Sequence, residues 1–307
     1  MARDPVRTVA VSGASGFIGS ALVAALRRNG ANLLRLVRRE ARAPDEIAWD
    51  PATGRIDASR LEGVTEVVHL AGENIAGGRW TEARKRRILE SRVRGTTQLA
   101  EALAGLQRPP TVWVSASAIG FYGDRGDAVL TETEPPGTGF LTEVVGAWER
   151  AADPARRAGI RVVHPRFGVM LHPSGGMLKP VLLPFRLGLG ARLGAGRQWM
   201  SWVSLRDGIG IIRFLLEQRE AHGPLNATSP APVTNAEFTS ALARALHRPA
   251  WMVIPRFLLE LVLGDLARET LLESTRAVPS RLTALGYRFQ DPELQPALDR
   301  MLNRIDS

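Results

Sequence analysis

The chain has 307 residues, of which 23% are charged and 45% hydrophobic, a composition typical of a folded globular protein with room for a large α/β domain and a smaller one. It contains no cysteine, which excludes disulfides, thiolate catalysis and cysteine–metal sites and agrees with a cytoplasmic location. The net charge of +9 comes almost entirely from arginine, and since no nucleic-acid motif accompanies it, we interpret it as a solvated surface.

The chain start gives no sign of secretion or of a membrane anchor. The first 13 residues, MARDPVRTVAVSG, lead directly into a glycine motif and do not resemble a signal peptide. No apolar run reaches the length of a membrane span, and no pair of histidines or acids has metal-ligand spacing. We therefore expect no membrane partner, no nucleic acid and no bound metal.

Residues 9–26, VAVSGASGFIGSALVAAL, join a short apolar strand to a helix through a glycine-rich turn. Gly13 permits a tight turn, Gly16 lets the backbone approach a pyrophosphate, and Gly19 lets the helix pack on the strand. The helix N-terminus then directs its N–H groups and dipole toward the phosphates. This pattern predicts a dinucleotide site made by Gly13, Ser15, Gly16, Phe17, Ile18 and Gly19.

A second strand at 32–37 ends in Arg38 and Arg39. An NAD-selective site places an acid near this point, to bind the adenine ribose hydroxyls. Guanidinium groups instead suit a 2′-phosphate, which a carboxylate would repel. We therefore predict that the cofactor is NADP(H), bound by Arg38 and Arg39. The alternative is that both arginines are merely exposed at a strand end.

Further strands are expected at 64–72, 111–116 and 160–165, with helices between them. A long helix begins after Thr81 and runs to about Ala104, and another covers about 140–157. Ligands bind such sheets at the carboxyl ends of the strands. We therefore add to the cofactor site the residues at these ends, namely Leu70, Ala71, Gly72, Ser115 and Arg166.

The alternation of strands and helices predicts an α/β fold, a doubly wound parallel Rossmann sheet with helices on both faces. From 172 onward the composition changes to glycines and prolines among leucines, followed by helical stretches at 205–218, 234–247, 255–274 and 292–304. We expect an NADP(H)-binding domain over 1–172 and a smaller α-rich cap or substrate domain over 173–307. Segments near 203–228, including a strand at 224–228, could return to the first domain.

With these motifs the chain resembles the extended short-chain dehydrogenase/reductase superfamily, and within it the epimerase-family branch that carries a C-terminal domain of unknown function. The resemblance rests on SGASGFIG at 12–19, HLAGENIAGGRWT at 69–81, SRVRGT at 91–96, SASAIGFYG at 115–123, FLTEVVGAWE at 140–149, QWMSWVSLRD at 198–207 and LTALGYRF at 282–289. It implies a nucleotide-binding Rossmann domain, a cap and an NAD(P)-dependent role.

The chain departs from the superfamily at the catalytic helix. The resemblance places Leu141 where the superfamily has its tyrosine and Val145 where it has its lysine, and Ala118 falls on the active-site serine or threonine. We predict Ser117 and Tyr122 as substitute catalytic residues, with an arginine in the electrostatic role of the lysine. The alternatives are that Tyr122 packs its loop and that the Ser117 hydroxyl caps one.

Other polar residues near these strands have structural interpretations. Glu73 is a general-base candidate, although a loop anchor is favoured. His69 and His164 lie inside predicted strands, where hydrogen-bonded core histidines are more common than ligands. Trp199 and Trp202 either line a substrate wall or pack between the domains.

Two functions follow from these observations. The first is an NADP(H)-dependent oxidoreductase acting on a small carbonyl or a nucleotide-sugar-like substrate, with a non-standard site. The second is a non-catalytic NADP(H)-binding sensor or interaction protein, so whether the chain is an enzyme stays open. The missing tyrosine and lysine make a strict sugar epimerase the weakest reading. The expected ligand besides the cofactor is an unidentified small-molecule substrate, and the protein partner that remains open is a second copy of the chain in a homodimer.

Overall fold

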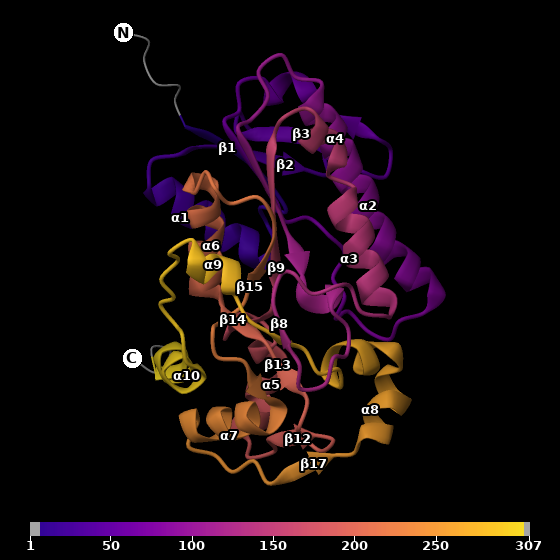
Figure 1. The fold of residues 1–307 in the computed structure, drawn as a ribbon, viewed down its shortest axis with the longest axis vertical. Helices are drawn as coiled ribbons and strands as arrows, with labels where there is room; N and C mark the ends of the chain where they lie inside the picture. Colours follow the sequence, from indigo (N-terminus) through magenta and orange to yellow (C-terminus); the bar gives the residue numbers. More distant parts are fainter. Residues whose placement is uncertain (1–6, 304–307) are drawn as a thin grey trace.

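The computed structural model describes residues 7–303, and its centre is a mostly parallel β-sheet with helices on both faces (Figure 1). Its strands follow the spatial order β15–β9–β6–β5–β1–β2–β3–β4, and the short β7 also pairs with β9. In chain order these strands are β1 (Thr8–Ser12), β2 (Asn32–Val37), β3 (Glu46–Asp50), β4 (Arg55–Ile56), β5 (Glu66–His69), β6 (Val112–Ser115), β7 (Ser117–Ala118), β9 (Arg161–Phe167) and β15 (Gly223–Ala227).

The strand order reverses direction next to β1. This strand pairs in parallel with β2 on one side and β5 on the other, so the chain winds outward from β1 both ways. Only β4 runs antiparallel to its neighbour, at the sheet edge. A doubly wound sheet opens a crevice at such a reversal, beyond the carboxyl ends of its strands. The glycine-rich turn follows β1 at this point, which confirms the predicted fold class.

The helices divide between the two faces of the sheet (Figure 1). One face carries α1 (Phe17–Arg28) and α6 (Leu205–Glu217), which bury side chains such as Leu22 and Ile211 in one core. The other carries α2 (Glu82–Ala104), α3 (Phe140–Arg150) and α4 (Asp153–Arg157), where Leu99 and Trp113 belong to a second core. Two short 3₁₀ turns, at Ala58–Leu61 and Ile119–Phe121, also belong to the part of the chain built on the large sheet.

The C-terminal part builds a smaller unit with a core of its own. Side chains from α5 (Leu178–Arg186), α7 (Asn235–Ala245) and α10 (Leu294–Asn303) pack together there. Around them lie short strands that form three small sheets: β10 (Val169–His172) with β11 (Gly175–Gly176) and β14 (Trp202–Ser204), β12 (Ala191–Leu193) with β17 (Met252–Ile254), and β13 (Trp199–Met200) with β16 (Val233–Thr234).

The predicted helix over 255–274 is interrupted in the structure. It divides into α8 (Arg256–Leu263) and a π-helical turn at Ala267–Leu271. Gly264 ends α8 with φ of +61°, a left-handed conformation that glycine adopts without strain. No described helix is long and apolar enough to cross a membrane.

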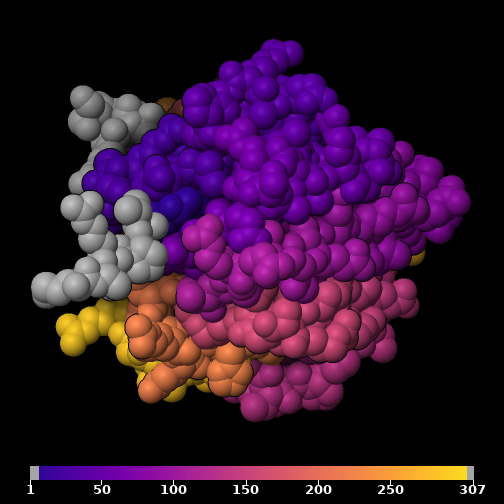
Figure 2. Space-filling view, turned by 90° about the horizontal axis from the view of Figure 1, so that it is seen from above, coloured from indigo at the N-terminus to yellow at the C-terminus, as the bar shows by residue number. Residues whose placement is uncertain are grey.

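Two later segments return to the large sheet. β15 pairs with β9 at the sheet edge, and α6 packs beside α1. Between α8 and α10, β18 (Arg276–Ala277) pairs with β8 (Val129–Leu130), and α9 (Ser280–Ala284) packs near β15. From above, the N-terminal half covers most of the visible face, and orange and yellow C-terminal segments reach its lower rim (Figure 2). The chain therefore crosses between the two units more than once.

Candidate functional site

The turn after β1 leaves no room for side chains at its glycines. Gly13 has φ of +69°, and a Cβ there would lie 2.8 Å from the carbonyl carbon of Leu70. A Cβ on Gly19 would come within 2.1 Å of the carbonyl oxygen of Gly13. Close packing of the turn on the end of β5 therefore requires glycine. It brings the predicted residues at 13–19 and 70–72 together at one place.

The N-terminus of α1 opens from this turn. Gly16 is the N-cap residue and, having no side chain, leaves the first-turn N–H groups without a side-chain cap. The N–H of Gly16 itself donates to the carbonyl oxygen of Gly13, at 2.9 Å. Ser15 and Gly16 are exposed, while Phe17 and Ile18 are half-buried. The first-turn N–H groups of α1 therefore have no side-chain acceptor, an arrangement that suits an anion.

The carboxyl end of β6 holds a buried hydroxyl without a partner. Ser115 is fully buried, and its Oγ has no hydrogen-bond partner among the described residues. Its backbone is fixed, because the Nδ1–H of His164 donates to the Ser115 carbonyl oxygen at 3.2 Å while Nε2 accepts from Arg156 at 2.5 Å. A fixed, partnerless hydroxyl at a strand end is suited to a ligand.

The two strand histidines are core residues, as the favoured interpretation predicted. His69 lies between the Ser12 hydroxyl, 2.6 Å from its Nδ1, and the Thr96 hydroxyl, 3.1 Å from its Nε2. Burial lowers the pKa of His69 to about 3 and that of His164 to about 4. Both imidazoles are therefore neutral at pH 7.

The two arginines after β2 differ in their contacts. Arg39 donates to both carboxylate oxygens of Glu46, at 2.8 and 2.7 Å. This pairing, with the backbone N–H of Arg42, lowers the pKa of Glu46 to about 2. Arg38 is exposed and forms no hydrogen bond or ion pair with residues 7–303. Of the two predicted phosphate ligands, Arg38 is the one whose charge is not paired with an acid among the described residues.

A buried polar network surrounds the predicted catalytic residues. Arg166 donates to Glu149 through Nε and Nη2, both at 2.8 Å, and through Nη1 to the Tyr122 hydroxyl at 3.1 Å. Tyr122 donates onward to Oδ1 of Asn226 at 2.7 Å, and Ser117 donates to Glu149 at 2.6 Å. Burial opposes the charges of Arg166 and Glu149, but their ion pair prevails, lowering the pKa of Glu149 and raising that of Arg166.

These contacts commit the predicted groups to the interior. The Tyr122 side chain is 0% exposed, and burial raises its pKa above the ordinary value. The Arg166 guanidinium carries protein partners on all three nitrogens and lies 3.5 Å from the ring centroid of Phe121. The arrangement favours the packing alternative for Tyr122. Catalysis by Ser117 and Tyr122, and cofactor contact by Arg166, stay predictions. The sequence motifs did not indicate a role for Glu149 or Asn226.

The helix that carries the superfamily's catalytic pair is α3, and here its inward stripe is apolar. Val145 is 2% exposed, and Leu141 packs against Gly120, where a Cβ would lie 3.1 Å from the leucine Cβ. The carboxylate of Glu269 accepts from the backbone N–H groups of Phe140 and Leu141, at 3.1 and 2.8 Å. A residue of the C-terminal unit thus caps this helix.

The C-terminal unit meets the loop after Tyr122 through a mixed polar contact. Trp199 donates from its indole nitrogen to Asp127 at 2.8 Å, and the Arg276 guanidinium lies 4.0 Å from its ring centroid. Trp202 is fully buried and belongs to the cap core. Glu273 is next in the chain to Ser274, whose hydroxyl accepts a hydrogen bond from the Trp199 backbone N–H. Burial, together with the charges of Glu269 and Asp124, raises the pKa of Glu273 to about 8.

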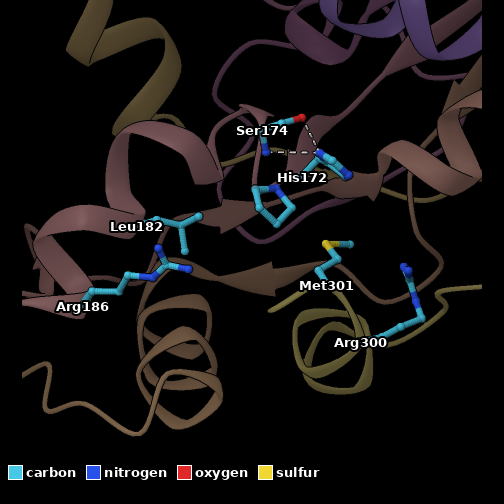
Figure 3. A pocket seen from close by; sticks show the side chains of 7 residues that line it. His172, Ser174, Leu182, Arg186, Arg300 and Met301 are labelled. Carbon is cyan, nitrogen blue, oxygen red and sulfur yellow. Dashed lines mark hydrogen bonds between the residues drawn. The ribbon is translucent and has the colours of Figure 1, made fainter. Parts of the chain in front are cut away.

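A cavity of about 550 Å³ lies between α5, α10 and the β10–β11 hairpin (Figure 3). A smaller one of about 200 Å³ adjoins it and shares His172, Arg300 and Met301. The His172 ring lies 6.0 Å from the ring of Phe17 at the start of α1. None of the predicted site residues lines either cavity. The described residues contain no cluster of acids or histidines suited to a metal ion.

Comparison with known proteins identifies relatives over nearly the whole chain. Residues 9–227 match the NAD dependent epimerase/dehydratase family, and residues 254–301 match a domain of unknown function, DUF1731. An epimerase family protein of Mycobacterium bovis is 44% identical over 290 residues, covering 94% of this chain and 96% of that protein.

Solved structures agree with these matches. The human epimerase family protein SDR39U1, crystallised with NADPH, is 35% identical with a TM-score of 0.87, over 96% of this chain and 99% of that one. MoeE5 in complex with UDP-glucuronic acid and NAD is 25% identical with a TM-score of 0.77, over 97% and 99% of the two chains. The fold is therefore shared with proteins crystallised with either dinucleotide.

Proposed function

The chain belongs to the NAD dependent epimerase/dehydratase family, and on this premise we propose that it binds NADP(H) and serves as an oxidoreductase with a non-standard active site. The observation that carries the proposal is the turn at 13–19, where Gly13 packs on Leu70, Gly19 packs on Gly13 and the α1 N-terminus has no side-chain cap. We assign cofactor binding to the unit built on the large sheet, and substrate contact to the C-terminal unit.

The residues present suit a dinucleotide. The N–H groups at the start of α1 would hold the pyrophosphate, and the partnerless hydroxyl of Ser115 would reach a polar group farther along the cofactor. When bound, the nicotinamide would supply or accept hydride. The chain itself would fix the cofactor at the strand ends and exclude water with the C-terminal unit.

The proposed preference for the phosphorylated cofactor rests on Arg38. Its guanidinium has no carboxylate partner among the described residues, whereas Arg39 is paired with Glu46. A free guanidinium binds a phosphate monoester through charge-assisted hydrogen bonds and gains nothing comparable from a ribose hydroxyl. The relative crystallised with NADPH is consistent with this choice.

Titration of the purified protein with NADPH and NADH tests the cofactor. We expect the Arg38→Ala variant to bind NADPH about tenfold or more weakly, with little change for NADH, as loss of a charge-assisted pair predicts. The matched control is Arg39→Ala, whose guanidinium is already neutralised by Glu46 and which should have the smaller effect. Equal loss for both nucleotides in Arg38→Ala would contradict the assignment.

The second candidate function is a non-catalytic NADP(H)-binding protein. It is supported by the apolar stripe of α3, where Leu141 and Val145 occupy the positions of the superfamily's catalytic pair, and by the burial of Tyr122. The two functions separate in a turnover assay of NADPH with a panel of small carbonyls and nucleotide sugars. Oxidation of NADPH with any of them supports the enzyme, while tight binding without oxidation supports the sensor.

A further inference from the structure

Arg92 on α2 is a half-buried cation that forms no salt bridge with the described residues. Its Nη1 donates to the carbonyl oxygens of Glu73, at 3.1 Å, and Ile88, at 3.2 Å. No carboxylate of residues 7–303 lies within ion-pair distance of it. A positive charge taken out of water without a counter-ion is costly, so its presence calls for a compensating anion.

The charge of Arg92 is desolvated but retained. Burial lowers its pKa to about 10, and the nearby charge of Glu73 offsets only part of that effect. The guanidinium therefore stays protonated at neutral pH. By contrast, Arg94, two residues further along α2, is exposed, and its Nη2 lies 3.4 Å from Oε1 of Glu90.

Two contacts place this cation at the crevice. The guanidinium carbon lies 3.4 Å from the point that a Cβ on Gly72 would occupy, just past the carboxyl end of β5. It also lies 5.1 Å from the ring centroid of Trp148. On α3, Trp148 follows Val145 by three residues and Leu141 by seven, so the three share one helix face. Arg92 therefore faces the apolar side of α3, where Val145 stands at the position of the superfamily's lysine.

Uncommitted donors gather at the same place. Nε and Nη2 of Arg92 make no hydrogen bond with the described residues. The indole Nε1 of Trp148 is buried and likewise has no acceptor within the described chain. Three nitrogen atoms, Nε and Nη2 of Arg92 and Nε1 of Trp148, thus carry N–H groups with no acceptor among the described residues.

We propose that Arg92 binds oxygen atoms of the cofactor between its pyrophosphate and its nicotinamide, so that the cation of this crevice comes from α2 instead of α3. The inference rests on the proposed function, because it requires a dinucleotide across the end of β5. It makes Arg92 a binding residue that the sequence analysis did not single out, although it lies within the SRVRGT segment.

Two variants test this role. We expect Arg92→Met to bind NADPH about tenfold or more weakly and Arg92→Lys to recover most of the affinity, because lysine restores the charge. The same loss should appear with NADH, unlike in Arg38→Ala, since Arg92 lies away from the 2′-phosphate. Arg94→Met is the matched control, and it should bind as the wild type does.

Melting of the apo protein separates binding from a structural role. If Arg92 serves the cofactor, Arg92→Met without nucleotide should melt at or above the wild-type temperature, because an uncompensated charge is removed. A much lower apo melting temperature, or unchanged NADPH affinity in Arg92→Met, would overturn the inference. If the wild type binds neither nucleotide, the proposed function itself fails; if it binds and Arg92→Met binds equally, only this inference fails.

Discussion

Arg38 and Arg39 are neighbours of the same residue type, yet the fold gives them different electrostatic situations. Both follow β2, and the sequence predicts a phosphate site for the pair. Glu46, at the start of β3, then engages Arg39 and leaves Arg38 free. The pairing of β2 with β3 determines which arginine meets that acid, so the distinction required the structure.

Ser115 and Ser117 provide a matched pair of buried hydroxyls with opposite expectations. Ser115 Oγ has no partner in the described chain, so Ser115→Ala should leave the free energy of unfolding unchanged or slightly higher while weakening NADPH binding. Ser117 donates to Glu149 at 2.6 Å, so Ser117→Ala should cost about 1–2 kcal/mol of stability. Urea unfolding of both apo variants, with NADPH titrations, makes the comparison. Equal destabilisation would contradict it.

Glu273 should make stability fall as pH rises. Burial, with Glu269 and Asp124 nearby, raises its pKa from 4.5 to about 8, so the folded state holds a proton that the unfolded state releases. The contribution of this proton to the free energy of unfolding is fully present below about pH 4.5 and is lost as the pH rises through 8. Glu273→Gln cannot ionise, so its melting temperature relative to wild type should increase from pH 5 to about pH 8. A difference independent of pH would refute this assignment.

Among the elements, α3 shows what local sequence can and cannot predict. Its apolar spacing indicates a helix from Phe140, and the structure begins it there. The predicted end near 157 is less accurate, because α3 stops at Arg150 and α4, with a proline in its first turn, follows. The cap of α3 comes from Glu269, 129 residues beyond Phe140, so no local pattern could have indicated it.

Removal of that cap should loosen the helix and the contact between the two units. Glu269→Ala leaves the N–H groups of Phe140 and Leu141 without acceptors and removes a negative charge from a helix N-terminus. We expect a loss of about 1–2 kcal/mol in the free energy of unfolding, measured by urea unfolding. The dependence of that free energy on urea concentration should not change. Glu269→Gln keeps one acceptor and should recover part of the loss. Equal stability of Glu269→Ala and wild type would show that the cap contributes nothing.

The C-terminal elements were the least predictable. The helix α5 contains Pro184 in its interior and lies in a stretch of glycines and prolines, which are residues that argue against a helix. Within the helical stretch at 255–274, α8 ends at Leu263, and Gly264 follows it with a positive φ. Their conformations depend on packing between α5, α7 and α10, which the sequence does not specify locally.

For the whole molecule, the alternation of elements was sufficient to predict the doubly wound sheet, because right-handed crossovers leave few alternatives. It did not indicate how firmly residues 265–278 are joined to the large sheet and to the elements around it. Lys85 of α2 pairs with Asp265 at 2.6 Å, Thr275 donates to the Gly123 carbonyl, and Asn226 donates to the Val278 carbonyl. Each of these contacts joins residues more than fifty positions apart in the sequence.

The central claim is that this fold holds NADP(H) at the turn after β1, with the 2′-phosphate at Arg38. A crystal structure of the protein soaked with NADPH tests it most directly. We expect pyrophosphate density against the backbone at 13–19 and the 2′-phosphate within hydrogen-bonding distance, about 3 Å, of the Arg38 guanidinium. Nucleotide density elsewhere, or a 2′-phosphate that points into solvent away from Arg38, would contradict it.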